Sequence, residues 1–405
     1  MRVESVSLAN RKDNRGGTID YGRISLLSAG HLFNDMYGNL LTAVMPYLVL
    51  RGQTTATLAG LILLVYLFGS SLLQPVFGLF ADQSGRRIFA VAGPLLVGAA
   101  TVSATLAPGP AVIFPLAAVA GVGTSAFHPQ AATMVNSLSA RSKGWTMSIF
   151  SMGGNIGFAL GPVLAAGIAL VGLRWSPLVL VPGVVLTLFL ARYAPSLPVR
   201  RSTGSVLGLL RSAARSSWRA LSLIVAVIAP RSAAQYALII LLPLYYHARG
   251  FPAELGSVYA FVLSLAGALG GLAGGHASDR FGRRIVVVST LLVSVPLLVV
   301  LLQITGPFVW PLLAASGAAL LASNSVTVVQ GQELLPGNTG VASGLTLGLG
   351  FGLSGIIASV FTALSDHIGV TNTMYLVPVL PLVAAVLGAV VPAGRSPALP
   401  VAAAE

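Results

Sequence analysis

Long apolar runs alternate with short polar connections from residue 24 to residue 392. Each run has about 20 residues or more, the length that a helix needs to cross a hydrocarbon core of ~30 Å. The runs are too long and too uniformly apolar for the alternating strands of a membrane barrel. The pattern therefore predicts an all-α polytopic membrane protein with twelve transmembrane helices, at about 24–50, 57–80, 88–106, 111–135, 145–170, 174–194, 219–247, 255–276, 285–305, 308–332, 341–365 and 370–392.

Composition excludes a water-soluble protein. Only 8% of the 405 residues are charged, against about 25% in soluble domains. The net charge of +13 would suggest nucleic acid in a soluble protein. Here 19 of the 23 lysines and arginines lie on one side when the N-terminus is cytoplasmic, as the positive-inside rule requires. We therefore expect a multi-pass protein of the inner (cytoplasmic) membrane with both termini cytoplasmic, embedded in the lipid bilayer, with no nucleic-acid partner.

The chain is predicted to consist of two similar halves. The segment Gly78–Arg87 recurs as Gly275–Arg284, at an offset of 197 residues. Repeated hydropathy and motifs at one offset are typical of duplicated transporter bundles. The predicted parts are a tail at 1–23, a six-helix bundle at 24–194, a connection at 195–218, a second six-helix bundle at 219–392 and a tail at 393–405.

The repeated loop segment carries the first family resemblance. GLFADQSGRR and its copy GHASDRFGRR resemble the G-x-x-x-D-x-x-G-R-R motif of the major facilitator superfamily. An aspartate in such a short loop caps a neighbouring helix or pairs with an arginine. The resemblance implies two pseudo-symmetric bundles and a gate latch in each half, made of Gly78, Asp82, Gly85, Arg86 and Arg87, and of Gly275, Asp279, Gly282, Arg283 and Arg284.

Three further motifs resemble the fosmidomycin-resistance branch of bacterial efflux permeases: HLFNDMYGN at His31–Asn39, GTSAFHPQAA at Gly123–Ala132, and SMGGNIGFALGP in the fifth helix. The resemblance implies proton-coupled drug export. Many drug/proton antiporters of the superfamily carry an arginine in the fourth helix, where this chain has His128 and Pro129. Their coupling scheme is therefore not transferred.

A stripe of small residues runs along the fifth helix, at Gly153, Gly157, Gly161 and Pro162. Spacing of four residues places these positions on one helix face. The stripe resembles a signature found mainly among antiporters of the superfamily. Close packing against another membrane helix is the alternative interpretation.

Two charged residues are predicted near the middle of the membrane, Asp35 in the first helix and Arg231 in the seventh. A charge at that depth is costly and requires a partner or a function. We hypothesise that Asp35 carries the proton and that Arg231 lies close enough to exchange partners with it. A static buried pair holding the halves together is the alternative.

His31 and His128 are predicted at a similar depth, closer to the inner face. Two histidines at one level would relay protons or bind an anionic substrate, because imidazole titrates near neutral pH. Ordinary packing histidines are the alternative. A metal site is disfavoured, because no carboxylate is expected at the same level. Since the chain has no cysteine, thiolate ligands are excluded, and no cofactor is implied.

Other polar residues near these positions are predicted to bind a small polar substrate by hydrogen bonds. Glu333 falls at the inner end of a predicted helix, where a solvated charge needs no function. For Asn155, hydrogen bonding between helices is an equally good interpretation. The predicted substrate set is Arg231, Gln235, Tyr37, Asn155, Gln130 and Asn324.

Motifs for other functions are missing from the sequence. There is no GxxxxGK nucleotide loop, no HExxH and no GxSxG, so neither ATP-driven transport by this chain nor enzymatic hydrolysis is predicted. The sequence favours a monomeric proton-coupled secondary transporter, a drug/proton antiporter that exports small polar compounds such as fosmidomycin. The alternative is a proton-coupled uptake symporter for a small anionic metabolite.

Overall fold

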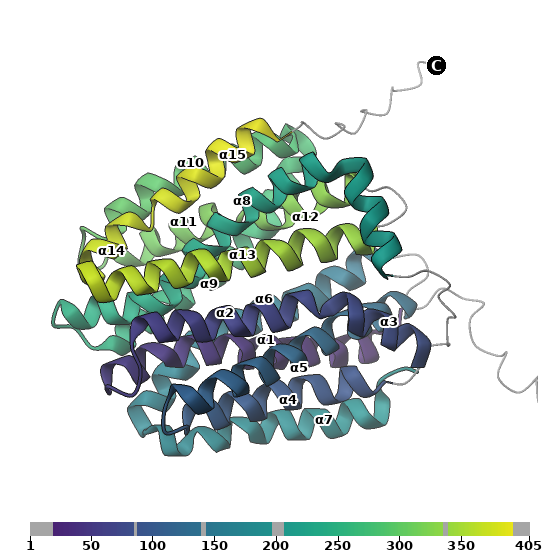
Figure 1. The fold of residues 1–405 in the computed structure, drawn as a ribbon, viewed down its shortest axis with the longest axis horizontal. Helices are drawn as coiled ribbons and strands as arrows, with labels where there is room; N and C mark the ends of the chain where they lie inside the picture. The colour runs from purple at the N-terminus through teal and green to yellow at the C-terminus, as the bar shows by residue number, and fades with distance from the viewer. Residues whose placement is uncertain (1–18, 85–86, 139–142, 197–205, 335–338, 392–405) are drawn as a thin grey trace, which may run out of the picture.

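The structure is a computed structural model that describes residues 19–84, 87–138, 143–196, 206–334 and 339–391 (Figure 1). Every regular element in these ranges is helical. The elements are α1 (Tyr21–Leu50), α2 (Ala56–Leu72), α3 (Gln74–Ser84), α4 (Ile88–Thr105), α5 (Pro110–Ser137), α6 (Lys143–Val171), η1 (Leu173–Val179), α7 (Leu180–Tyr193), α8 (Val206–Ala248), α9 (Ala253–Phe281), α10 (Arg283–Leu301), α11 (Val309–Leu321), α12 (Ser323–Leu334), α13 (Thr339–Ile368), α14 (Val370–Leu376) and α15 (Val379–Val390).

These elements form twelve membrane crossings in the described part of the chain. Eleven stretches there are long and apolar enough to span a membrane, and α1, with 30 residues, supplies the twelfth. Four crossings are built from two consecutive elements: α2 with α3, η1 with α7, α11 with α12, and α14 with α15. The predicted all-α, twelve-helix architecture is confirmed.

The helix that follows the connection between the halves is longer than its apolar run, Trp218–Ala248. The connection expected at 195–218 is helical from Val206 onward, because α8 runs without interruption from Val206 to Ala248. The sequence between residues 206 and 218 contains several arginines and serines, and this polarity led to its assignment as a loop. Helix formation depends on backbone hydrogen bonds rather than on hydropathy, so a polar helix end extends beyond the apolar run.

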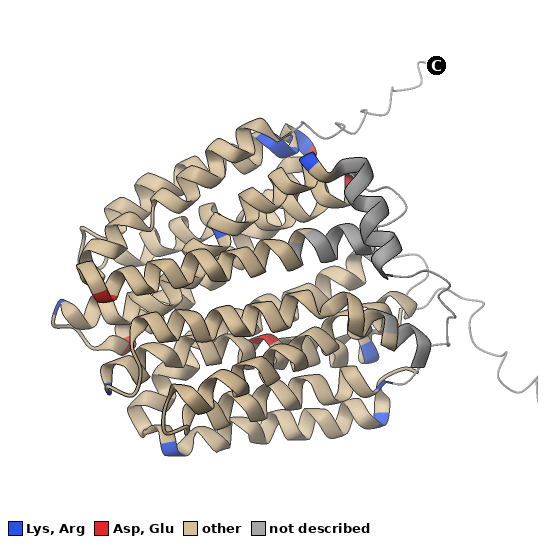
Figure 2. Ribbon diagram, viewed as in Figure 1, with Lys and Arg blue, Asp and Glu red and all other residues tan. Residues whose placement is uncertain are grey.

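The outer surface is hydrophobic along the middle of the molecule. Leu188, Leu269 and Val360 are each more than half exposed, which is unfavourable in water but suits contact with lipid tails. Charged residues lie mainly at the two ends of the helix bundle (Figure 2). The fold therefore presents an apolar belt between two polar ends, as a membrane requires.

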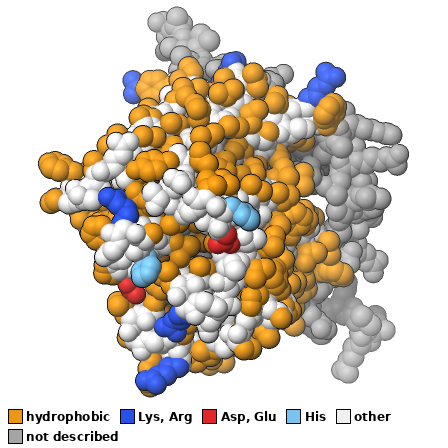
Figure 3. Space-filling model, turned by 60° about the vertical axis from the view of Figure 1, so that its left-hand side comes forward, with side chains coloured by type: hydrophobic (Ala, Val, Ile, Leu, Met, Phe, Trp, Pro, Cys, Tyr) orange, Lys and Arg blue, Asp and Glu red, His pale blue; other side chains and the backbone are white. Residues whose placement is uncertain are grey.

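Helices α1 to α7 form one half of the molecule and α8 to α15 the other (Figure 1). We name the two ends of the bundle after the ends of α1, the Tyr21 side and the Leu50 side. Figure 3 shows the Leu50 side turned toward the viewer, with charged and histidine side chains scattered among hydrophobic ones. The halves meet where α2 packs on α13, α6 on α9, and α1 on α8.

Hydrogen bonds join the two halves near the Leu50 side. The Tyr47 hydroxyl on α1 lies 2.8 Å from the Ser257 hydroxyl on α9. On α2, the backbone N–H and the hydroxyl of Thr57 both donate to Asp366 Oδ2 of α13, at 2.8 and 2.7 Å. Gly60 allows close approach there, because a side chain at this position would collide with Thr362. The halves are thus fastened together at this side.

Candidate functional site

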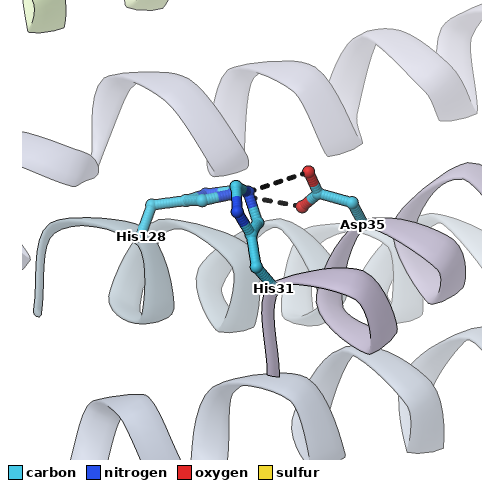
Figure 4. A group of neighbouring side chains, drawn as sticks. All are labelled: His31, Asp35 and His128. Atoms are coloured by element: carbon cyan, nitrogen blue, oxygen red, sulfur yellow. Dashed lines mark hydrogen bonds and ion pairs between the residues drawn. The ribbon is translucent and has the colours of Figure 1, made fainter. Parts of the chain in front are cut away.

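Three titratable side chains meet inside the first half: His31 and Asp35 on α1, and His128 on α5 (Figure 4). His31 Nε2 lies 3.1 Å from Asp35 Oδ2, and His128 Nε2 lies 3.1 Å from Asp35 Oδ1. The two Nε2 atoms are 3.2 Å apart. All three side chains are mostly buried, with 12 to 24% of their surface exposed. We call this group the carboxylate–imidazole cluster.

The hydrogen bonds of His31 determine where its protons lie. Its Nδ1 is 2.8 Å from the Phe150 carbonyl oxygen on α6, which only accepts, so Nδ1 carries a hydrogen. A neutral His31 then has a lone pair on Nε2, and that lone pair faces a carboxylate oxygen. The contact at 3.1 Å between His31 Nε2 and Asp35 Oδ2 is therefore a hydrogen bond only when one further proton is bound, on either atom.

His128 can supply one hydrogen bond to the cluster without an extra proton. Its Nε2 donates to Asp35 Oδ1 when His128 is neutral with the hydrogen on Nε2. The Nδ1 atom of His128 is then a buried acceptor with no hydrogen-bond partner in the described part of the structure. Asn34 also donates to Asp35 Oδ1, at 3.0 Å. The carboxylate is thus surrounded by one amide donor and two imidazoles, and an imidazole can donate or accept according to where its protons lie.

The wall behind the cluster is the backbone of α6. A side chain at Gly154 would collide with the His31 ring and come within 2.8 Å of Asp35 Oδ2. The Phe150 ring stacks on His31 with centroids 4.2 Å apart. Gly154 thereby lets α6 approach α1 closely enough to orient the His31 ring. Sequence reasoning missed both residues; the Gly-Gly pair at 153–154 is the signal that could have found one of them.

The predicted stripe on α6 also packs on α1. Side chains at Gly153 and Gly157 would collide with the backbone of α1, and one at Gly161 would lie 2.9 Å from Asn39. Pro162 follows within the same helix. The stripe therefore brings α1 and α6 together and supports the cluster from behind. The antiporter interpretation of the stripe stays a prediction.

Asp35 and Arg231 do not form the expected pair. No ion pair joins them among the described residues, since Asp35 is held by His31 and His128 of its own half. Arg231 Nη2 donates instead to Ser232 Oγ at 2.8 Å and to Asn324 Oδ1 at 3.1 Å, both in the second half. The expected contact is wrong for this conformation, and so is the alternative of a static pair between the halves.

The reason for disfavouring a metal is also wrong. Asp35 lies at the level of the two histidines, and ligand-type atoms of the three residues lie within 4.8 Å of one another. These atoms already contact each other at hydrogen-bond distances of 3.1 to 3.2 Å, so protons alone satisfy them. We therefore interpret the cluster as a proton site.

Two residues of the predicted substrate set contact backbone groups of the first half. The Tyr37 hydroxyl donates to the Val179 carbonyl at 2.8 Å, and the Tyr37 side chain is fully buried. Gln130 Oε1 accepts from the backbone N–H of Ala90 at 2.6 Å, in the first turn of α4. The polar groups of Tyr37 and Gln130 thus contact backbone groups in this conformation, and their assignment to substrate binding stays a prediction.

The other predicted substrate residues keep surfaces available to a ligand. Gln235 lies one turn beyond Arg231 on α8 and is partly buried, as is Asn324 on α12. Asn155 follows Gly154 on α6 and is exposed. Their role in binding stays a prediction.

The second gate segment forms a network of ionic contacts on the Tyr21 side. Arg283, at the start of α10, lies 2.7 Å from Glu333 of α12 and 3.4 Å from Asp279 of α9. It also donates to Ser278 Oγ at 3.3 Å. Glu333 thus has an ionic partner, and the expectation that it needs no function stays a prediction. Gly282, between α9 and α10, has a φ of +91°, a value that a residue with a side chain rarely adopts. Arg284 is exposed, and Gly275 lies against Ser325.

The first gate segment is described only in part. Arg87 donates to the Ala194 carbonyl at 2.8 Å, at the end of α7. Gly78 lies on α3 against Pro129. Asp82 is in α3, but its side chain lies outside the described residues, as do Gly85 and Arg86. The pairing of this aspartate therefore stays a prediction.

A twelve-helix membrane fold with a polar cluster between its helices defines a class of multi-pass transport protein. The family model of the Major Facilitator Superfamily matches residues 27–359, so this chain belongs to that superfamily. The family is one of transporters, not of enzymes.

Relatives and solved structures agree with this family. The chain is 32% identical to the "Uncharacterized MFS-type transporter YfnC" of Bacillus subtilis, over 93% of this chain and 94% of that one. It is 28% identical to the fosmidomycin resistance protein of Escherichia coli, over 89% and 91% of the two chains. A bacterial homolog of the human lysosomal transporter Spinster, in an inward-facing, unoccupied conformation, has the same fold with a TM-score of 0.74 at 16% identity, covering 91% and 96%. So has the nucleoside transporter NupG, with a TM-score of 0.74 at 15% identity, covering 90% and 98%.

Proposed function

We propose that this protein is a proton-coupled antiporter that exports small polar compounds such as fosmidomycin by alternating access. One observation carries the proposal: His31 Nε2 and Asp35 Oδ2 lie at a hydrogen-bond distance of 3.1 Å. With a neutral His31 and an ionised Asp35, no hydrogen lies between these two atoms. The bond therefore forms only when the carboxylate–imidazole cluster binds one further proton. Asp35 is the carrier in this scheme, with His31 and His128 as relays. The similarity to the fosmidomycin resistance protein supports export of such compounds.

Coupling requires the proton site to respond to the opening of the transporter. Gly154 of α6 lies against the cluster, and α6 also packs on α9 of the other half. A movement of the halves therefore shifts the helix that orients His31. Two conformations with different proton affinity follow, and a proton gradient then biases one of them.

We place both termini in the cytoplasm, so that the Tyr21 side faces the cytoplasm of a bacterium and the Leu50 side faces outward. The distribution of lysine and arginine supports this orientation. The gate segments, with Arg283 and Glu333, then lie at the cytoplasmic end, where we propose that they latch the second half. The protein works as a monomer, because one chain contains both halves.

A proton-coupled uptake symporter for a small anionic metabolite is the second candidate. The same cycle runs in either direction, and the buried Arg231 suits an anion moving either way. Direction is therefore tested separately, by comparing transport in inverted and right-side-out vesicles with an imposed pH gradient.

The decisive experiment measures fosmidomycin transport into proteoliposomes driven by a pH gradient. Asp35→Asn is expected to abolish gradient-driven transport while leaving expression and folding intact. Asp20→Asn is the matched control, because Asp20 caps the same helix at its exposed end and asparagine caps equally well. Full gradient-driven transport by Asp35→Asn would contradict the proposal.

A further inference from the structure

A guanidinium group without a counter-ion lies in the second half of the protein. Arg231 is fully buried, with 0% of its surface exposed. Its Nη2 is occupied by Ser232 and Asn324, both neutral. Its Nε and Nη1 atoms have no hydrogen-bond partner in the described structure. These nitrogens carry N–H donors with nothing to receive them.

Carboxylates of the described part of the chain do not neutralise this charge. None lies within ion-pair distance of Arg231, and those with a described polar partner contact other groups: Asp20 with Arg23, Asp35 with the histidines, Asp279 and Glu333 with Arg283, and Asp366 with Thr57. A buried charge is stable only when paired or hydrogen-bonded. The unfilled donors of Arg231 therefore indicate an anion-binding position.

The internal duplication relates this position to the carboxylate–imidazole cluster of the first half. Asp35 and His128 are hydrogen-bonded and 93 residues apart, and so are Arg231 and Asn324. Arg231 corresponds to Asn34, the neighbour of Asp35, at the offset of 197 residues, and Asn324 corresponds to His128 at an offset of 196. In the first half these helices carry a carboxylate with two imidazoles, and in the second half the equivalent helices carry a guanidinium with an amide.

We propose that Arg231 and Asn324 bind the anionic group of the transported compound, a phosphonate, phosphate or carboxylate. This inference rests on the proposed function and names its substrate class. Guanidinium is the side chain best suited to such oxyanions, because its planar donors match their geometry. The Asn324 Oδ1 atom holds Nη2, which leaves the Nε and Nη1 donors for the ligand.

Access to Arg231 requires the halves to separate. On α8, Tyr236 packs against Phe158 of α6 in the other half, with ring centroids 5.9 Å apart. This contact lies little more than one turn from Arg231 and belongs to the surface along which the halves move apart in alternating access. The anion then enters when α6 and α8 move apart. Because α6 also forms the wall behind the carboxylate–imidazole cluster, the movement that admits the substrate also displaces that wall.

The test is equilibrium binding to the purified full-length protein in detergent, which requires no proton gradient. The probes are fosmidomycin, whose phosphonate is charged, its uncharged phosphonate diester, inorganic phosphate and benzoate. Arg231→Gln is expected to weaken fosmidomycin binding by roughly 10- to 100-fold, from the usual strength of charged hydrogen bonds. The diester is expected to bind weakly and equally to both proteins.

Two variants separate binding from structure. Arg249→Gln changes an exposed arginine that directly follows the same helix; it is the matched control and should bind fosmidomycin like the wild type. Ligand-free Arg231→Gln should melt at the wild-type temperature or above it, because an uncompensated buried charge is removed. An arginine needed only for packing would instead give a less stable variant that keeps its affinity, and this result would overturn the proposal.

Other outcomes would also overturn it. Equal binding of fosmidomycin and its diester, or no binding of any of the three anions, excludes an anion site. If phosphate or benzoate binds and phosphatidylglycerol displaces it, while fosmidomycin does not bind at all, the position belongs to lipid headgroups rather than to substrate. The proton assay on Asp35→Asn is independent of these measurements, so failure of the proposed coupling is distinguishable from failure of the anion site.

Discussion

The Nε2 atom of His128 lies 3.1 Å from the Oδ1 atom of Asp35, and this hydrogen bond has a counterpart in the other half of the protein. Asn324 corresponds to His128 in the internal repeat and Arg231 to Asn34, the neighbour of Asp35, and these two residues are joined at the same distance of 3.1 Å. Both halves thus contain an interhelical hydrogen bond between polar side chains of equivalent helices, a carboxylate with an imidazole in the first half and a guanidinium with an amide in the second.

Replacing His128 with asparagine, the residue found in its counterpart, tests the proton chemistry of the cluster. The amide of His128→Asn can still donate to Asp35 but has no titratable nitrogen. We expect a folded transporter that releases fewer protons per bound substrate. Proton release on substrate addition, followed with a pH indicator in weakly buffered detergent, measures this number. Unchanged release would show that His128 is a packing residue.

Gly154→Ala is expected to impair the cluster from behind. The added methyl group meets the His31 ring and Asp35 Oδ2, and such overpacking destabilises a protein by about 1–3 kcal/mol. We expect a lower melting temperature and weaker proton-driven transport. Gly167→Ala on the same helix is the control, because nothing lies within 4 Å of its added atom. Equal behaviour of the two variants would show that Gly154 does not position His31.

Asp366→Ala should loosen the Leu50 side. The variant loses both hydrogen bonds from Thr57, which join α2 to α13. Because the native chain has no cysteine, Ser359→Cys provides a single reporter thiol buried between these helices. Its labelling by a polar maleimide should become several-fold faster in the Asp366→Ala background. His367→Ala, one residue further and also exposed, should leave the rate unchanged.

Two acidic residues share Arg283 unequally, and their contributions to stability should differ accordingly. Glu333 lies 2.7 Å away with 34% of its side chain exposed, whereas Asp279 lies 3.4 Å away with 65% exposed. Exposed ion pairs contribute about 0–1 kcal/mol. Glu333→Gln is therefore expected to lower the melting temperature in detergent, and Asp279→Asn to change it less. The reverse order would indicate that Asp279 is the main partner of Arg283.

Much of the architecture could be predicted from the sequence because hydropathy is a local property. Twelve apolar runs define twelve crossings, since each must cover the thickness of a membrane regardless of its neighbours. The mid-membrane positions of Asp35 and Arg231 follow from counting residues along a helix. The helix α8 begins before its apolar run because backbone hydrogen bonding continues where hydropathy falls.

Only the tertiary structure decided which side chains meet. Asp35 and Arg231 share a depth, yet each turns to partners in its own half, because contact depends on the rotation of each helix about its axis. Tyr37 and Gln130 occupy promising positions in the sequence but satisfy backbone groups in this conformation. The sequence by itself determined how many helices cross the membrane and which rare charges they contain. Helix packing, through glycines such as Gly154 that allow close approach, decided that one carboxylate lies between two imidazoles while one guanidinium keeps unfilled donors.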